Sequence, residues 1–380
     1  MIHKIIMQFC GWELMRNGRD LICHKQTVYE KIENAKEMEN QRIKPRIEWI
    51  DTAKGICILL VVYSHVYMGD HPAFLHFQDY FRMPLYFLLS GLFFKTYNNF
   101  HNFFIKKTNK LLIPFVFAYI FLSTPMLFFL QYRAGLPVTF PSDFWEVERW
   151  RFLCKGNGTL WFLCCLFILN IAFYAIFLIS RHKTKLIIVC SMLIGLISFW
   201  MGRHEIFIPL WGDAALTALP FFLFGYILRN KSNILYEPFG KKHWVICALS
   251  FSILMFIYLY NSDFERIKIE LIHGDNYFEV DCLSMYLGGF CGTLFVLMIA
   301  KRLNHIPLVS YLGRYSIVIL LTHVVLIILL RITLYHFNIN IDYIHLIMLG
   351  LFIIVVLIEI PIIKFCIKYL PYVFAQKDLL

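Results

Sequence analysis

Charged side chains are scarce in this chain of 380 residues. Asp, Glu, Lys and Arg make up 16% of the sequence, against roughly a quarter of an average globular protein. Hydrophobic residues account for 59% and aromatic residues for 18%, and no long polar block separates the apolar runs between residues 53 and 366. The composition therefore excludes a soluble protein and favours one all-α, polytopic membrane domain.

Metal-binding, disulfide and signal-peptide patterns are also lacking. The 11 cysteines show no ligand spacing, and most lie within apolar runs as small buried hydrophobes. No metal cofactor is therefore expected. No apolar core follows the first lysine, so residues 1–45 are interpreted as a disordered cytoplasmic tail rather than a signal peptide, with Met38 as an alternative translation start. Residues 46–370 would form the membrane domain and 371–380 a second cytoplasmic tail.

Ten segments approach the length of about 20 apolar residues that a helix needs to cross the hydrocarbon. The sixth is interrupted by Pro209, Trp211, Gly212 and Asp213. The predicted spans are residues 53–69, 80–97, 111–131, 160–180, 186–201, 207–228, 243–261, 282–300, 315–335 and 343–366.

The basic residues predict the orientation of these spans. With a cytoplasmic N-terminus, the inner segments hold 26 Lys and Arg, whereas the outer loops together with Arg331 at the outer end of the ninth span hold 8, as the positive-inside rule predicts. Both termini are then cytoplasmic. The net charge of +11 reflects this orientation, and no nucleic-acid-binding motif is present. Membrane lipids are the expected surroundings, and a homo-oligomer is left open.

Three polar or ionisable groups interrupt the first span, in the stretch DTAKGICILLVVYSH at residues 51–65. At about 100° per residue, Lys54 and His65 point within about 20° of each other, and Asp51 lies about 40° to the other side of His65. A charge facing mid-membrane lipid costs about 2.5–3.5 kcal/mol. This polar stripe is therefore predicted to face protein or a water-filled cavity.

Each member of the stripe also has a purely structural interpretation. Asp51 alone would cap the helix, Lys54 would extend to the cytoplasmic headgroups, and His65 would be a hydrogen-bonded packing residue. Three such groups on one helix face favour a functional site.

The segment WIDTAKGICILLVVYSHV (49–66) resembles the first helix of the integral membrane acyltransferase family 3. In that helix a basic residue is followed, eleven positions later, by an essential histidine, and Lys54 and His65 match this spacing. Five more segments match in order: FRMPLYFLLSGLFFK (81–95), KKTNKLLIPFVF (106–117), GTLWFLCCLF (158–167), ALPFFLFGYILRN (218–230) and LGRYSIVILLTHV (312–324). Two positions depart from the pattern, with Arg82 where many members have histidine and Ser64 where many have glycine.

The resemblance implies about ten helices and the transfer of an acetyl or other acyl group from coenzyme A to a sugar hydroxyl. Acetyl-coenzyme A would be the co-substrate, and a cell-surface or lipid-linked carbohydrate the acceptor. The resemblance also implies location in a bacterial inner membrane.

A sugar hydroxyl needs a base to remove its proton, and histidine suits this task near neutral pH. His65 is the expected general base in a direct attack, with a covalent acyl-histidine as the open alternative. Arg82 is the leading candidate to bind the developing oxyanion. Ser90 and Ser316 are weaker candidates, because membrane serines often bond back to their own helix.

The donor is expected at the inner face. Lys106, Lys107 and Lys110 are placed to contact its phosphates, although inner loops are also basic merely to set orientation. The pantetheine arm would pass Lys54, which Asp51 would hold charged by pairing with it.

The acceptor is expected in the outer half, shaped by the loop 132–159. Trp161 could stack on a sugar or simply anchor the helix at the interface. His323 lies inside the ninth span, where a histidine is a functional candidate but packing is an equal alternative. Ser316 is a further candidate contact.

Two rival functions remain from sequence alone. A transporter or flippase of a lipid-linked glycan would suit ten helices and a polar stripe, but would not turn over acetyl-coenzyme A. A structural subunit without catalysis would be unaffected by His65→Ala. Within the enzyme class, succinyl or longer acyl groups and lipid or peptide acceptors stay open.

Overall fold

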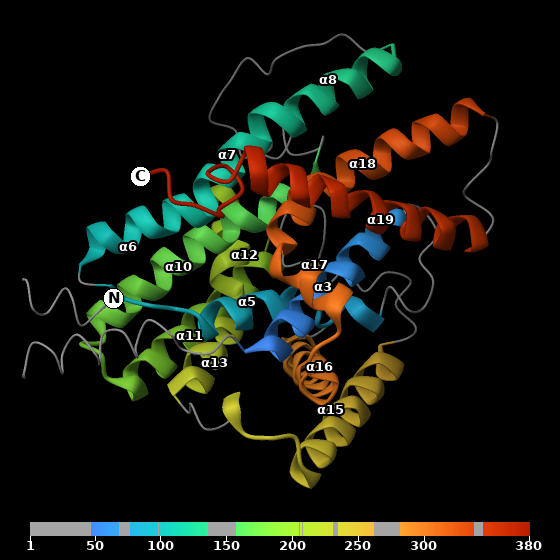
Figure 1. Cartoon of the computed structure of the whole chain (residues 1–380). Helices are drawn as coiled ribbons and strands as arrows, with labels where there is room; N and C mark the ends of the chain where they lie inside the picture. The colour runs from blue at the N-terminus through green and yellow to red at the C-terminus, as the bar shows by residue number, and fades with distance from the viewer. Residues whose placement is uncertain are drawn as a thin grey trace, which may run out of the picture. The chain divides into compact units, whose positions relative to one another are not determined.

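The structure is a computed structural model in which the described residues form helices and turns (Figure 1). These residues are 47–67, 77–97, 99–135, 157–204, 206, 208–230, 235–261, 282–337 and 345–380. The predicted tail 1–45, including Met38, lies outside them. The contacts divide the chain between Ile47 and Glu48, and all the helices described below belong to the second unit.

The helices follow one another without any strand in the described part of the chain. The first half contains α3 (Glu48–Val66), α5 (Arg82–Leu92), α6 (Phe100–Lys107), the π-helical turn η1 (Thr108–Leu112), α7 (Ile113–Ala118), the π-helical turn η2 (Tyr119–Ser123), α8 (Thr124–Arg133), the 3-10 turn η3 (Gly158–Leu160) and α10 (Trp161–Ile179). The second half contains α11 (Thr184–Arg203), the 3-10 turn η4 (Pro209–Trp211), α12 (Gly212–Thr217), α13 (Leu219–Asn230), α15 (Lys241–Tyr260), α16 (Cys282–Leu303), α17 (Pro307–Arg314), α18 (Ser316–His336) and α19 (His345–Tyr369).

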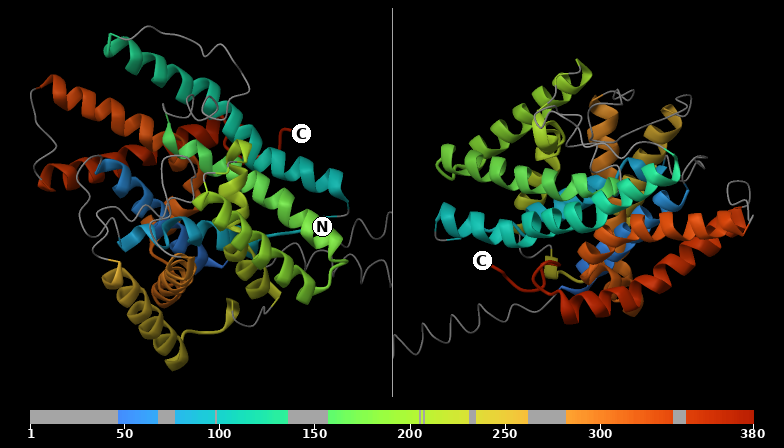
Figure 2. Two further views of the ribbon diagram at one scale, coloured as in Figure 1. Left: turned by 180° about the vertical axis from the view of Figure 1, so that it is seen from behind. Right: turned by 90° about the horizontal axis from the view of Figure 1, so that it is seen from above.

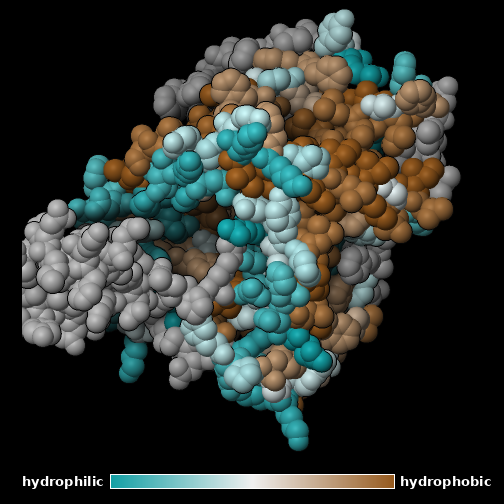
Figure 3. Space-filling view, viewed as in Figure 1, coloured by the Kyte–Doolittle hydropathy of each residue, from teal (hydrophilic) through white to brown (hydrophobic). Residues whose placement is uncertain are grey.

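Eight of the described helical runs are long and apolar enough to cross a membrane. Their apolar side chains are widely exposed, and the face that carries α18 and α19 is predominantly hydrophobic in Figure 3. Figure 2 shows these two helices side by side, and they are in contact. Contiguous apolar surface of this kind is expected where lipid is the solvent. The chain is therefore an all-helical, multi-pass membrane protein.

Two of the ten predicted spans, 80–97 and 207–228, are shorter helices in the structure. The first corresponds to α5, which has 11 residues and ends at Leu92. Residues 94–97 are not helical, and Tyr97 has a left-handed φ of 55°. Hydropathy counted these apolar residues as part of the span because it does not register where a helix ends.

The predicted break in the sixth span is confirmed. Leu210 and Trp211 both have a left-handed φ of 58°, which non-glycine residues rarely adopt. The buried Asp213 lies in the first turn of α12, and its carboxylate oxygen accepts a hydrogen bond of 2.8 Å from the backbone N–H of Ala214. The second part of this span is α13, a helix of 12 residues.

The basic segment 95–110, predicted as an inner loop, is largely helical. It belongs to a continuous helical run of 34 residues, Phe100–Arg133, which includes the predicted third span 111–131. Asn99 begins this run because its side chain accepts a hydrogen bond of 2.8 Å from the backbone N–H of Asn102, as N-cap residues do. The polar residues of this segment led to its prediction as a loop, although a helix begins there at Phe100.

Helix α3 packs mainly against α17 and α16, and also against α18, α19 and α5. Its contact with α17 is made by backbone on backbone. A Cβ atom at Gly313 would lie 1.9 Å from the Asp51 carbonyl oxygen, and one at Gly55 would lie 2.0 Å from the Val309 carbonyl oxygen. The two glycines therefore permit an approach that any side chain would prevent, as small residues do between membrane helices.

Helices α5 and α13 are joined in the same way. A Cβ atom at Gly91 would lie 1.9 Å from the Phe222 carbonyl oxygen, and one at Gly225 would lie 1.9 Å from the Leu88 carbonyl oxygen. The short helix α5 is thereby held between α13 and α3, and Arg82 stands at its first position.

We expect Gly313→Ala to lower the free energy of unfolding by about 1–3 kcal/mol, because the added methyl group must separate α17 from α3. Gly350→Ala is the matched control, since a Cβ atom at Gly350, within α19, would meet nothing within 4 Å. It should be neutral or slightly stabilising. Unfolding in detergent would measure both, and equal stabilities would contradict this account of the α3–α17 contact.

Candidate active site

Two histidines from different helices meet inside the bundle. His65 lies near the end of α3 and His323 in the first half of α18, with ring centroids 5.2 Å apart. His323 is fully buried, and His65 is partly accessible. The structure therefore turns the His65 end of the polar stripe toward protein and brings together two residues that the sequence had singled out separately.

The hydrogen bond of His323 to its own helix defines which ring nitrogen is free. Its Nδ1 lies 2.6 Å from the Ile319 carbonyl oxygen. A carbonyl can only accept, so Nδ1 carries a proton. Nε2 is buried without a hydrogen-bond partner, and in the neutral ring it is the acceptor. A buried acceptor without a partner is unusual and suggests a site for a ligand proton.

Arg82 supplies a free donor to the same region. Its guanidinium is within electrostatic range of His65, and Nη2 forms an ion pair of 3.1 Å with Asp79. Nη1 is buried without a hydrogen-bond partner. The Cys57 thiol of α3 lies 2.9 Å from the Arg82 carbonyl oxygen, which links the start of α5 to α3. An unpaired guanidinium nitrogen thus accompanies the unpaired imidazole nitrogen.

Tyr86 is a site residue that sequence reasoning missed. Its hydroxyl lies 3.4 Å from the Lys54 carbonyl oxygen and within hydrogen-bonding reach of Ser316 and Cys57. It therefore bridges α3, α5 and α18. The available signal was its spacing, because residues four apart lie on one helix face and Tyr86 follows Arg82 by four positions.

The inner members of the stripe are placed away from the histidines. Lys54 Nζ lies 4.8 Å from the centroid of the Phe93 ring at the end of α5. Asp51 is buried, with its backbone against Gly313 of α17. The pairing of Asp51 with Lys54 stays a prediction.

The three predicted phosphate-binding lysines have different surroundings. Lys106 and Lys110 both form ion pairs with Asp378 near the C-terminus. Lys107 Nζ lies 5.6 Å from the centroid of the Phe103 ring. These two ion pairs were not predicted from the sequence, because Asp378 lies more than 260 positions from Lys106 and Lys110.

The candidate acceptor contact Trp161 is less accessible than expected. Trp161 is buried at the start of α10, with its ring centroid 6.1 Å from that of Phe162. Ser90, one of the weaker oxyanion candidates, is partly accessible, and its hydroxyl lies 3.5 Å from the Asn170 side-chain nitrogen. Most of the loop 132–159 lies outside the described residues.

The turn that precedes α10 fixes α18 just before His323. The Asn157 side-chain amide donates to the Leu321 carbonyl oxygen at 2.7 Å. The Thr159 hydroxyl lies 2.7 Å from the Leu320 carbonyl oxygen. Both side chains are buried, and neither was predicted to contribute to the site.

Glu359 fixes the other side of α18 and was also missed. This carboxylate is 1% exposed within α19, and each of its oxygens lies 2.9 Å from the Thr322 hydroxyl. Thr322 immediately precedes His323. The signal was present in the sequence, since a carboxylate inside a membrane helix requires a partner.

A family model described as "Acyltransferase domain" matches residues 47–362, which is most of the chain. The chain therefore belongs to acyltransferase family 3 and is a membrane acyltransferase. No curated protein and no solved structure matches the chain.

We expect Thr322→Val to lower the free energy of unfolding by about 1 kcal/mol, the scale of an interhelical hydrogen bond in a membrane. Thr333→Val is a matched control, because both hydroxyls bond the carbonyl four residues earlier at 2.9 Å but only Thr322 also meets Glu359. Unfolding in mixed micelles would compare the variants. If both changes cost the same, the Thr322–Glu359 bond does not stabilise the bundle.

Proposed function

We propose that this acyltransferase moves an acetyl group from cytoplasmic acetyl-coenzyme A to a hydroxyl of a cell-surface or lipid-linked carbohydrate. The observation that carries the proposal is the His65–His323 pair, with its free Nε2 and the free Nη1 of Arg82 beside it. An acceptor for the hydroxyl proton and a donor for the oxyanion are what acyl transfer from a thioester requires.

In the proposed reaction the acceptor oxygen attacks the thioester carbonyl carbon while His65 takes the hydroxyl proton. The negative charge that forms on the carbonyl oxygen is stabilised by the guanidinium of Arg82. Collapse of the tetrahedral intermediate breaks the carbon–sulfur bond, and coenzyme A leaves with the proton that His65 releases. His65 thereby returns to its neutral form.

His323 is proposed to hold the acceptor hydroxyl beside His65. Its Nδ1 proton is engaged by Ile319, so the free Nε2 can accept a hydrogen bond from the substrate. Ser316 and Trp161 remain candidates for further acceptor contacts, and the hydrogen-bonding reach between Ser316 and Tyr86 favours Ser316.

The donor is proposed to enter from the cytoplasmic side of a bacterial inner membrane. Lys106, Lys107 and Lys110 would bind its phosphates, since ammonium groups attract phosphate oxygens. The pantetheine arm would pass Lys54, whose ammonium lies at the same end of α5 as Phe93. The excess of Lys and Arg in the predicted inner segments supports a cytoplasmic position for both chain termini.

His65→Ala and His65→Gln should abolish acetylation of the cell's glycans, and His323→Ala should reduce it strongly. Mass spectrometry of glycans from a deletion strain complemented with each variant would detect the acetyl group. His336→Ala, at the exposed end of α18, is the matched control and should retain it. A fully acetylated glycan in the folded His65 variants would refute the assignment of the base.

The same strains would separate acyl transfer from transport. Membranes with the wild-type chain should convert labelled acetyl-coenzyme A to free coenzyme A and labelled glycan. A transporter would move the glycan and leave the thioester intact.

Arg82→Gln should lower the turnover number by roughly 10²–10³-fold, the scale of losing one oxyanion donor, with a smaller change in the KM for acetyl-coenzyme A. Labelled acetyl-coenzyme A and membranes of the deletion strain, as the acceptor source, would provide the assay. Arg314→Gln, at the exposed end of α17, controls for loss of a positive charge. A change in KM alone would instead place Arg82 in substrate binding.

A further inference from the structure

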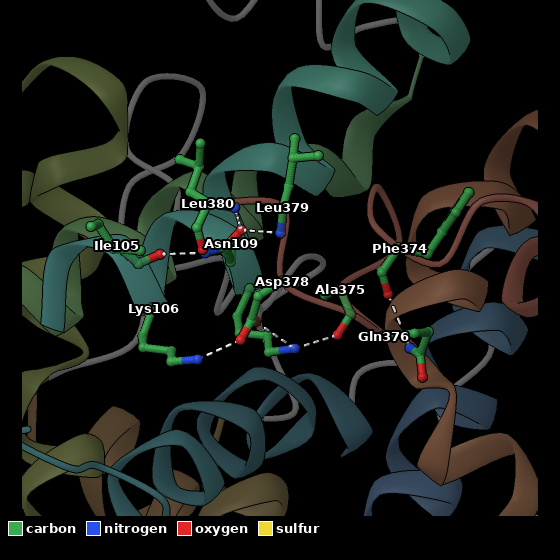
Figure 4. Close-up of polar contacts among 10 residues, drawn as sticks. Ile105, Lys106, Asn109, Phe374, Ala375, Gln376, Asp378, Leu379 and Leu380 are labelled. Carbon is green, nitrogen blue, oxygen red and sulfur yellow. Dashed lines mark hydrogen bonds and ion pairs between the residues drawn. The ribbon is translucent and has the colours of Figure 1, made fainter. Parts of the chain in front are cut away.

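The C-terminal segment, residues 370–380, lies along α6 and η1 and places a carboxylate between two lysines (Figure 4). Asp378 is bonded to Lys106, and its other oxygen lies 3.2 Å from Lys110 Nζ. The hydrogen bond from Lys106 is the main cause that lowers the pKa of Asp378. The carboxylate is therefore ionised at neutral pH and neutralises part of the positive charge on this helix.

Asn109 holds the backbone of the same segment. It lies fully buried in the π-helical turn η1. Its side-chain oxygen accepts from the backbone N–H groups of Leu379 and Leu380 at 2.7 and 2.9 Å, and its side-chain nitrogen donates to the Leu380 carbonyl oxygen at 3.0 Å. The segment is thus bound by a specific set of hydrogen bonds.

The middle of the segment is a tight turn. The backbone N–H groups of Gln376 and Lys377 donate to the Pro371 carbonyl oxygen at 2.8 and 3.0 Å. Ala375 has a left-handed φ of 57°, which is unfavourable for a residue other than glycine. Lys110 offsets this strain by donating to the Ala375 carbonyl oxygen at 2.8 Å. A strained turn of this kind persists only while its contacts hold it.

The ion pairs of the C-terminal segment are exposed to solvent, whereas its apolar contact through Phe374 is buried. The Phe374 side chain is buried, with its ring 5.7 Å from that of Phe117. The side chains of Lys106 and Lys110 are instead 43% and 44% exposed, and that of Asp378 is 31% exposed. Exposed ion pairs are weak, so a ligand with several negative charges can displace the carboxylate while Phe374 keeps the segment nearby.

We propose that the C-terminal segment and the phosphates of the acyl donor compete for Lys106 and Lys110, so that Asp378 restrains donor binding. The inference rests on the proposed function, because it takes those lysines as the phosphate site. A carboxylate and a phosphate are alternative anionic partners for an ammonium group. The segment covers the lysines when the donor is absent and yields them when the donor binds.

Binding of coenzyme A to the purified full-length chain in nanodiscs tests the competition. Asp378→Asn should bind coenzyme A roughly three- to tenfold more tightly than wild type, because two exposed ion pairs no longer oppose it. Glu237→Gln is the matched control, since it removes one negative charge from another ion pair, with Lys242. Its affinity should match that of wild type.

The double variant Lys106→Gln/Lys110→Gln completes the cycle. It should bind coenzyme A more weakly, and adding Asp378→Asn to it should change nothing further, because the partners of the carboxylate are gone.

A carbodiimide, which joins a carboxylate to an amine only where the two are in contact, reports the position of the segment directly. Coenzyme A should reduce the Lys106–Asp378 cross-link severalfold and leave the Lys242–Glu237 cross-link unchanged, as judged by peptide mass spectrometry.

The outcomes separate this inference from the proposed function. If coenzyme A binds wild type and Asp378→Asn equally and leaves the Lys106–Asp378 cross-link intact, the competition is refuted and the donor assignment stands. If coenzyme A binds no variant, the donor assignment fails and the competition with it. The proposal is supported if Asp378→Asn tightens coenzyme A binding in the wild-type chain but not in the Lys106→Gln/Lys110→Gln variant.

Discussion

The backbone contact between α3 and α17 is the constraint on which the site depends. Gly55 and Gly313 bring the two helices closer than side chains would allow. Thr52 of α3 reinforces this contact, because its hydroxyl lies 2.8 Å from the Ser310 hydroxyl of α17. With α17 in this position, α18 follows at once and runs along α3. The contact between His65 and His323 therefore depends on glycine at positions 55 and 313, where a larger residue would separate α3 from α17.

Around this pair, buried polar groups are bonded almost wherever they fix a helix. Asn157 and Thr159 bind carbonyl groups of α18 on one side, and Thr322 binds Glu359 on the other. Among the buried side-chain atoms of the described residues that lack a hydrogen bond, Nη1 of Arg82 and Nε2 of His323 are two that belong to the candidate site. An unpaired donor and an unpaired acceptor in one site are preorganised for a ligand.

The sequence predicted the fold class and most of the helices, because long apolar runs and the order of basic residues can be seen along the chain without knowing its contacts. It did not predict where α5 ends, since Phe93 and Phe94 are as apolar as the helix before them. Nor did it predict that 100–110 is helical, because Asn99 caps it through a local hydrogen bond. His65 and His323 were each identified from their place in apolar spans, but their contact joins positions that are 258 residues apart in the sequence. The contact of Asp378 with Lys106 joins positions that are even farther apart. Such contacts follow from packing, which one sequence read alone does not contain.

The helical run from Phe100 to Arg133 has a consequence for how the protein is seated in a bilayer. Its 34 residues at about 1.5 Å each give roughly 50 Å, whereas the hydrocarbon layer is about 30 Å thick. Lys106 and Lys107 near the start of the run, and Tyr132 and Arg133 in its last turn, favour projection of the surplus into the interfaces over deep tilting. The thickness of the membrane therefore determines how far the lysine-bearing end of this helical run extends beyond the hydrocarbon layer. In a thinner membrane, more of the run would be exposed to water.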